Sequence, residues 1–195
     1  MKVRLGKKDA LIIVDVQKDF CPGGALPVPQ GDKVVEPLNR YIHLFSRHGS
    51  LVIATRDWHP ENHSSFEEYG GIWPKHCIQN TEGAEFHDDL KLPEDVIVIS
   101  KATEAGKEAY SGFEGTNLEK ILKGHGVRRV YVGGLATDYC VKATVLDALR
   151  LGFCVFLLLD GICGVNINPE DSERAIAEML EKGAAGIILD ELKGG

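Results

Sequence analysis

The sequence predicts an α/β fold in which helices cover both faces of a mostly parallel β-sheet. Short apolar runs alternate with helical patterns along the chain, as is typical of repeated strand–helix units. Most of the runs are continuously apolar rather than alternating, which favours strands that are buried on both faces. The chain has 195 residues, 44% of them hydrophobic. We therefore expect residues 1–195 to form a single three-layer αβα domain, Rossmann-like in its general layout.

The predicted strands are short segments rich in valine, isoleucine and leucine. In chain order they are Ala10–Val16, Leu51–Thr55, Val96–Ser100, Val130–Gly133, Phe153–Leu159 and Ala185–Leu189. Cys154 lies inside the fifth run, and we expect it to be buried there, as most free cysteines are.

The predicted helices show apolar residues spaced three and four positions apart, with a glycine after each. The first places Val34, Leu38, Ile42 and Phe45 on one face and stops at Gly49. The fourth has a proline near its start, where the missing N–H costs nothing. The four helices are expected at Asp32–His48, Asn117–Lys123, Asp138–Leu151 and Pro169–Lys182.

The segment from Asp57 to Asp95 has little periodicity. Loops of this length inside a compact domain are usually functional or disordered. This one carries two tryptophans and four histidines, a composition that argues against disorder. We interpret it as a functional loop.

Charge and cysteine content narrow the classes of partner. The net charge of −7 leaves no basic face for nucleic acid. No export signal is visible and the apolar runs are too short to span a bilayer, so we expect a cytoplasmic protein without a membrane partner. The five cysteines are odd in number and form no C-x-x-C pair, so we expect no disulfides.

The residues that follow the first four strands form a candidate site. Ligands of open α/β sheets bind beyond the carboxyl ends of the strands. There the chain places Asp15, then Asp57 with His59, then Lys101, and then Cys140. One edge of the sheet would thus carry two acids, a histidine, a lysine and a cysteine, a combination that indicates an active site.

Cys140 is either a small buried residue, as most free cysteines are, or a nucleophile. If Thr137 caps the following helix, Cys140 lies in its first turn, where the helix dipole favours a thiolate. Asp15 is the candidate base, provided that burial raises its pKa, and Lys101 would hold the charged pair together. Backbone N–H groups near Ala136 and Cys140 would form an oxyanion hole. The shared strand edge favours the nucleophile.

Asp57 and His59 are two residues apart, so in extended chain they point the same way. A carboxylate with an imidazole suits a divalent metal that prefers nitrogen and oxygen ligands. His76 or His63 would supply a third ligand.

These residues resemble those of the nicotinamidases, also called pyrazinamidases, within the isochorismatase-like cysteine hydrolases. The similarity covers nearly the whole chain in the family's order and is weakest after about Asp160. The matching segments are ALIIVDVQKDFCPGGALPV (Ala10–Val28), RDWHPENHSSF (Arg56–Phe66), WPKHCIQNTEGAEF (Trp73–Phe86), KATEAGKEAYSGFEG (Lys101–Gly115) and VGGLATDYCVKATVLDALRLGF (Val132–Phe153).

The resemblance implies a six-stranded parallel sheet and a role for each residue of the strand-end site. Asp15, Lys101 and Cys140 match the family's catalytic triad. The metal ligands would be Asp57, His59 and His76, while His63 matches a position that binds metal only in some members. The residues that match the substrate pocket are Phe20, Leu26, Trp73, Tyr110 and Ala136, and those that match the oxyanion hole are Ala136 and Cys140. The bond between Leu135 and Ala136 matches a cis peptide bond of the family.

The activity that the resemblance implies is metal-dependent hydrolysis of nicotinamide to nicotinate and ammonia through a cysteine thioester. Pyrazinamide is a second expected substrate, and NAD salvage is the expected role. One divalent ion is expected, most readily zinc, with iron or manganese as the other options. A homo-oligomer is an open option.

Three alternative functions remain from the sequence. They are a sister hydrolase of carbamoyl compounds or isochorismate, a nucleotide-binding or structural module, and a redox or metal-storage protein. The first strand lacks the G-x-G-x-x-G of dinucleotide sites.

Overall fold

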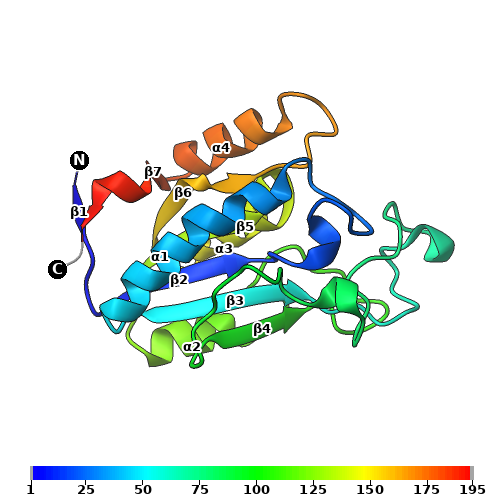
Figure 1. Cartoon of the computed structure of the whole chain (residues 1–195), viewed down its shortest axis with the longest axis horizontal. Coiled ribbons are helices and arrows are strands. Elements are labelled where there is room, and N and C mark those ends of the chain that lie inside the picture. The colour runs from blue at the N-terminus through cyan, green and yellow to red at the C-terminus, as the bar shows by residue number, and fades with distance from the viewer. Residues whose placement is uncertain (1, 194–195) are drawn as a thin grey trace.

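A computed structural model describes residues 2–193 of the chain and contains a six-stranded sheet in which every neighbouring pair of strands is parallel. Figure 1 shows this sheet with helices on both sides, so the predicted α/β fold is confirmed. The strand order is β4-β3-β2-β5-β6-β7. The strands are β2 (Asp9–Val14), β3 (Leu51–Asp57), β4 (Ile97–Lys101), β5 (Arg129–Leu135), β6 (Cys154–Cys163) and β7 (Ala185–Ile187).

Helix α1 covers one face of the sheet, and the other three helices cover the opposite face. Leu11 and Ile13 of β2 pack in the same cluster as the apolar face of α1, whereas Ala10, Ile12 and Val14 pack with the other helices. This alternation explains why β2 reads as a continuous apolar run. The helices are α1 (Val35–Arg47), α2 (Leu118–Gly124), α3 (Lys142–Arg150) and α4 (Asp171–Glu181).

Shorter elements complete the described chain. A second parallel sheet pairs β1 (Val3–Arg4) with β8 (Leu192–Lys193), which brings the two ends of the described chain together. The 3₁₀ turns are η1 (Lys18–Phe20), η2 (Gly31–Val34), η3 (Glu67–Tyr69), η4 (Glu82–Ala84) and η6 (Leu189–Glu191), and η5 (Thr137–Val141) is a π turn. No helix in residues 2–193 is long and apolar enough to cross a membrane.

Two local expectations are wrong. Cys154 is exposed rather than buried, because it is the first residue of β6, outside the covered middle of the strand. The helix expected at Asp138–Leu151 begins instead with the π turn η5, and α3 starts only at Lys142. All five cysteines are free thiols.

The strand register determines which residues meet at the carboxyl edge of the sheet. Val14 is paired with both Thr55 and Gly134, and Asp57 is paired with Lys101. Gly134 has a φ of +123°, and a Cβ there would overlap the backbone of Val14, so glycine is required for β5 to pass this close. The residues just beyond Val14 therefore lie between the ends of β3 and β5, and the end of β4 lies on the far side of β3.

Candidate active site

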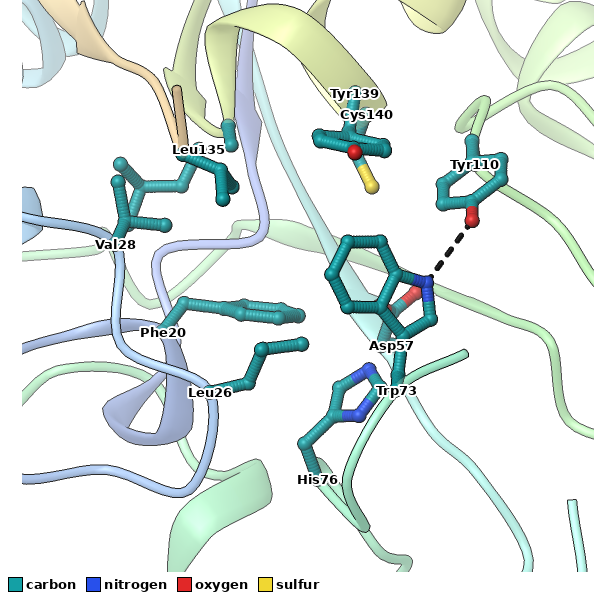
Figure 2. Close-up of a pocket in the computed structure, with 12 residues that line it drawn as sticks. Phe20, Leu26, Val28, Asp57, Trp73, His76, Tyr110, Leu135, Tyr139 and Cys140 are labelled. Carbon is teal, nitrogen blue, oxygen red and sulfur yellow. Dashed lines mark hydrogen bonds between the residues drawn. The ribbon is translucent and has the colours of Figure 1, made fainter. Parts of the chain in front are cut away.

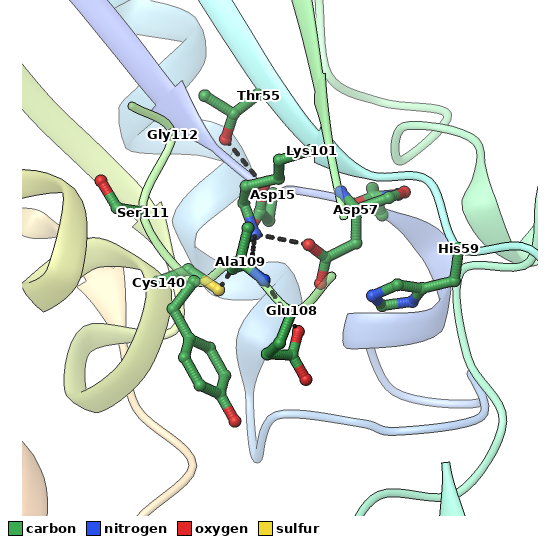
Figure 3. Close-up of polar contacts among 12 residues, drawn as sticks. Asp15, Thr55, Asp57, His59, Lys101, Glu108, Ala109, Ser111, Gly112 and Cys140 are labelled. Atoms are coloured by element: carbon green, nitrogen blue, oxygen red, sulfur yellow. Dashed lines mark hydrogen bonds and ion pairs between the residues drawn. The ribbon is translucent and has the colours of Figure 1, made fainter. Parts of the chain in front are cut away.

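Lys101 lies at the centre of the polar cluster at this edge. Its Nζ is 2.9 Å from Asp15 Oδ2 and forms a second ion pair with Asp57 Oδ1. It also donates to the carbonyl of Ala109 (3.2 Å) and lies 3.4 Å from Cys140 Sγ. Figure 3 shows its side chain directed between these groups. The structure thus brings together an acid, a lysine and a cysteine from the carboxyl ends of three different strands.

Charge neutralisation explains how a lysine is fully buried here. Burial alone lowers the pKa of Lys101, but the Asp15 and Asp57 carboxylates outweigh it and raise the pKa well above its usual value. The ammonium is therefore retained. A buried cation is tolerated only with such partners.

Asp15 leaves the strand direction immediately after β2. Its φ of +49° is unusual for a residue other than glycine and turns its side chain toward Lys101, a kind of conformation that is common at functional sites. Thr55 Oγ1 donates to Asp15 Oδ1 at 2.7 Å. Burial raises the pKa of Asp15, Lys101 opposes that shift, and Asp57 adds to it. This is the change that a carboxylate needs to act as a base toward a thiol.

Cys140 lies in the π turn rather than in an α-helical first turn. Thr137 does not cap the segment: the N-cap residue is Ala136, and no side chain makes a capping bond. Burial raises the pKa of the Cys140 thiol well above its ordinary value, Lys101 lowers it in part, and Asp15 and Asp57 raise it. The resting group is consequently a thiol rather than the thiolate expected from a helix dipole, and it needs a nearby base. A carboxylate oxygen of Asp15 lies within 4.8 Å of its sulfur.

Asp57, His59 and His76 form a cluster that fits a metal ion. One potential ligand atom from each lies within 4.8 Å of the others, and all three residues are buried. His59 Nε2 is buried without a hydrogen-bond partner, which is costly unless an ion occupies that direction. Burial, with a smaller contribution from His76, lowers the pKa of His59 to about 3, so its ring is neutral, as a ligand must be.

The other ring nitrogens orient these two histidines. His59 Nδ1 lies 3.1 Å from the carbonyl of His76, and His76 Nδ1 lies 2.7 Å from the carbonyl of Pro74. Such contacts fix the tautomer of metal-binding histidines. His63 differs, because its two ring nitrogens contact Ser65 Oγ (2.7 Å) and the carbonyl of Lys107 (3.1 Å).

A pocket lies between Cys140 and the proposed metal ligands Asp57 and His76. Figure 2 shows Phe20 and Leu26 on one side and Trp73 with Tyr110 on the other, with Cys140 and His76 at opposite ends. Trp73 Nε1 donates to the hydroxyl of Tyr110 at 3.0 Å. All five residues expected around a substrate line this pocket: Phe20, Leu26, Trp73, Tyr110 and Ala136. The peptide bond between Leu135 and Ala136 is cis, as expected.

Several residues of the site were not anticipated from the sequence. Tyr139, with its ring centroid 5.2 Å from that of Trp73, also lines the pocket, as do Val28, Leu135 and Val165. Gln17 is fully buried and holds the main chain of Asp57 from both directions: its Oε1 accepts from Asp57 N, and its Nε2 donates to Asp57 O, each at 2.8 Å. The only sequence feature that could have indicated Gln17 is its position two residues after Asp15, at the same strand end.

Comparison with known proteins agrees with this geometry. The isochorismatase domain model matches residues 9–190. The nicotinamidase of Escherichia coli (strain K12) is 44% identical over 196 residues, covering 90% of this chain and 92% of that protein.

Two solved structures are also similar. The pyrazinamidase of Pyrococcus horikoshii in complex with zinc is 60% identical, with a TM-score of 0.90 over 93% of this chain and 99% of that one. PnC1 from L. infantum in complex with nicotinate is 34% identical, with a TM-score of 0.92 over the full length of both chains. The chain described here therefore belongs to the isochorismatase family of hydrolases and resembles its nicotinamidases and pyrazinamidases.

Proposed function

We propose that this protein hydrolyses nicotinamide to nicotinate and ammonia, with Cys140 as the nucleophile. The observation that carries the proposal is the buried Lys101, which contacts both the Asp15 carboxylate and the Cys140 sulfur at the end of an aromatic pocket. The relatives named as nicotinamidases and pyrazinamidases supply the substrate class. Pyrazinamide, which carries the same carboxamide on a similar ring, is a second substrate.

The reaction begins with proton transfer from Cys140 to Asp15, whose pKa is raised by burial. The sulfur attacks the carboxamide carbon, and the N–H groups of Ala136 and Cys140 receive the oxyanion. Asp15 then returns its proton to the departing ammonia. Water attacks the thioester with Asp15 again as base, and nicotinate leaves. Lys101 stays charged throughout and stabilises the ionised Asp15 and the thiolate.

Asp57, His59 and His76 would hold one divalent ion, and we propose zinc, given the zinc complex of the Pyrococcus relative. Bound by these three residues, the ion would act as a Lewis acid toward the ring nitrogen of the substrate. Phe20 and Trp73 would confine the substrate ring between them. The bound ring would then be held with its carboxamide directed toward Cys140, which favours attack by the sulfur. Such a reaction would place the protein in NAD salvage.

The first prediction tests the nucleophile. In Cys140→Ala the sulfur that forms the thioester is missing, so ammonia release from nicotinamide should fall by at least about 10³-fold. Zinc content should stay equal to that of the wild type, because Cys140 is not among the proposed ligands. Ammonia release and metal content of the purified protein are the measurements.

Cys154→Ala is the matched control, because Cys154 is exposed and outside the pocket, and it should retain activity. Full activity in Cys140→Ala would rule out the covalent mechanism. A zinc-loaded wild type that releases no ammonia from nicotinamide or pyrazinamide would instead point to a sister hydrolase, such as one acting on carbamoyl compounds.

A further inference from the structure

We propose that Asp19 is a positioning residue that joins the apolar wall of the pocket to the loop carrying His76, and thereby controls both metal retention and substrate binding. The part of this inference that concerns substrate rests on the function proposed above. Asp19 lies in η1 (Lys18–Phe20), directly before Phe20 of the pocket. It does not itself line the substrate pocket, so it would act through other residues.

Asp19 accepts three hydrogen bonds from two separate segments. Its Oδ1 accepts from the main-chain N–H of Ala25 at 3.0 Å, and its own carbonyl accepts from Leu26 at 3.0 Å. Its Oδ2 accepts from the main-chain N–H of Cys77 at 2.7 Å. Leu26 is a wall of the pocket and Cys77 follows the proposed ligand His76. The Asp19 side chain thus links Ala25, the residue before Leu26 of the pocket wall, to Cys77, the residue after His76.

Cys77 is held from both directions. Its carbonyl accepts from the main-chain N–H of His59 at 3.0 Å, while its own N–H donates to Asp19. The residue is fully buried and has a φ of +48°, a conformation that costs free energy and persists only where surrounding contacts impose it. The hydrogen bond to Asp19 is one such contact. Its loss would free the loop that places His76 opposite His59.

Two glycines leave the space that Asp19 occupies. A Cβ at Gly83 would overlap the Asp19 carboxylate, and a Cβ at Gly24 would overlap its main chain. The main chain at Gly24 and Gly83 therefore lies directly against Asp19, which is half-buried. Only a carboxylate offers acceptors at both ends, because asparagine would turn its NH₂ group toward one of the two N–H donors.

The test uses two variants that disturb this carboxylate by different means. Asp19→Asn replaces one acceptor with a donor. Gly83→Ala keeps the aspartate but pushes its carboxylate out of place, and Gly83 has no positive φ that an alanine would strain. Gly124→Ala is the control, because a Cβ there meets nothing within 4 Å and Gly124 ends α2, remote from the site.

Zinc affinity of the full-length protein is measured by competition with a chromophoric chelator. Substitution of a residue that orients a metal ligand typically weakens metal affinity by about 10–100-fold. We expect zinc affinity to fall by that factor in both variants. The KM for nicotinamide, measured at saturating zinc, should rise about tenfold with a smaller change in kcat. Alkylation of Cys140 by iodoacetamide, followed by peptide mass spectrometry, should stay within about twofold of wild type, because Asp19 contacts none of Asp15, Lys101 and Cys140.

The outcomes separate the two proposals. Zinc affinity and KM within about twofold of wild type in a folded Asp19→Asn variant would overturn the role of Asp19. If Asp19→Asn fails to fold, Gly83→Ala decides in the same way. A general loosening of the protein would accelerate Cys140 alkylation and also contradict a positioning role. If the wild type binds zinc but does not hydrolyse nicotinamide, the proposed function fails, and the zinc comparison still tests Asp19.

Discussion

At the scale of single residues, the site depends on one buried cation shared by two buried carboxylates. Lys101 contacts Asp15 and Asp57, and the side chains of all three are at most 7% exposed. Asp57 would therefore serve two purposes, as a metal ligand and as a partner of the lysine. The buried charges are stable only as a set, because removing one member leaves another without compensation.

The prediction that follows concerns stability. Lys101→Met should lower the free energy of unfolding by about 3–5 kcal/mol, the usual cost of leaving a buried charge unpaired. Lys107→Met is the control: Lys107 is 72% exposed and pairs with Glu104 on the surface, so its loss should cost at most about 1 kcal/mol. Denaturant unfolding followed by circular dichroism measures both. Equal effects in the two variants would show that the cluster does not depend on its cation.

Residue types at strand ends were sufficient to predict much of this cluster. Asp15, Asp57, Lys101 and Cys140 each follow an apolar run, and the carboxyl ends of parallel strands share one edge. Gln17 was not predicted, because its role is to replace a missing main-chain partner of Asp57, which only the path of the chain after β2 reveals. The protonated state of Cys140 likewise depends on burial, a property that no local pattern shows.

At the scale of elements, α1 covers one face of the sheet largely by itself. Leu38 is fully buried and points at two glycines of the sheet: a Cβ on Gly133 or on Gly161 would lie 2.9 or 3.0 Å from its Cδ2. The glycines therefore let the helix approach β5 and β6 closely. This contact holds the strands whose ends carry the site.

Shortening Leu38 tests this packing. Leu38→Ala should lower the free energy of unfolding by about 2–5 kcal/mol, the range for a leucine truncated in a close-packed core. Leu180→Ala in α4, where the side chain is 39% exposed, should cost less than about 1 kcal/mol. Thermal or urea unfolding gives both values. A loss below about 1 kcal/mol for Leu38 would mean that α1 is not tightly packed on the sheet.

At the scale of the whole molecule, the proposed metal site joins the end of a strand to the long loop that follows it. Asp57 and His59 come from the end of β3, and His76 comes from the long loop that follows. Such a site exists only in the folded chain, so metal binding would stabilise the fold. Two expectations stay predictions: that residues 1–195 form one domain, and that the protein is cytoplasmic. A homo-oligomer stays an open option.

Zinc should accordingly raise the melting temperature of the wild type. At a free zinc concentration of 100 times the Kd, binding adds about 2.7 kcal/mol to the free energy of unfolding. For a protein of this size that raises the melting temperature by about 5–10 °C. His59→Ala should abolish the shift, whereas His87→Ala, a histidine of the same loop outside the cluster, should preserve it. Differential scanning calorimetry with and without zinc checks this. An unchanged shift in His59→Ala would place the ion elsewhere.

The sequence by itself determined the fold class, the strands, and the edge of the sheet at which the candidate site residues meet. These features follow from apolar periodicity and from the parallel arrangement it implies, which are local properties repeated along the chain. Tertiary structure decided the rest: the π turn at Cys140, the exposure of Cys154, the links made by Gln17 and Asp19, and the pKa shifts of the buried groups. Each of these depends on which distant groups become neighbours, and burial and charge compensation exist only once the chain has folded.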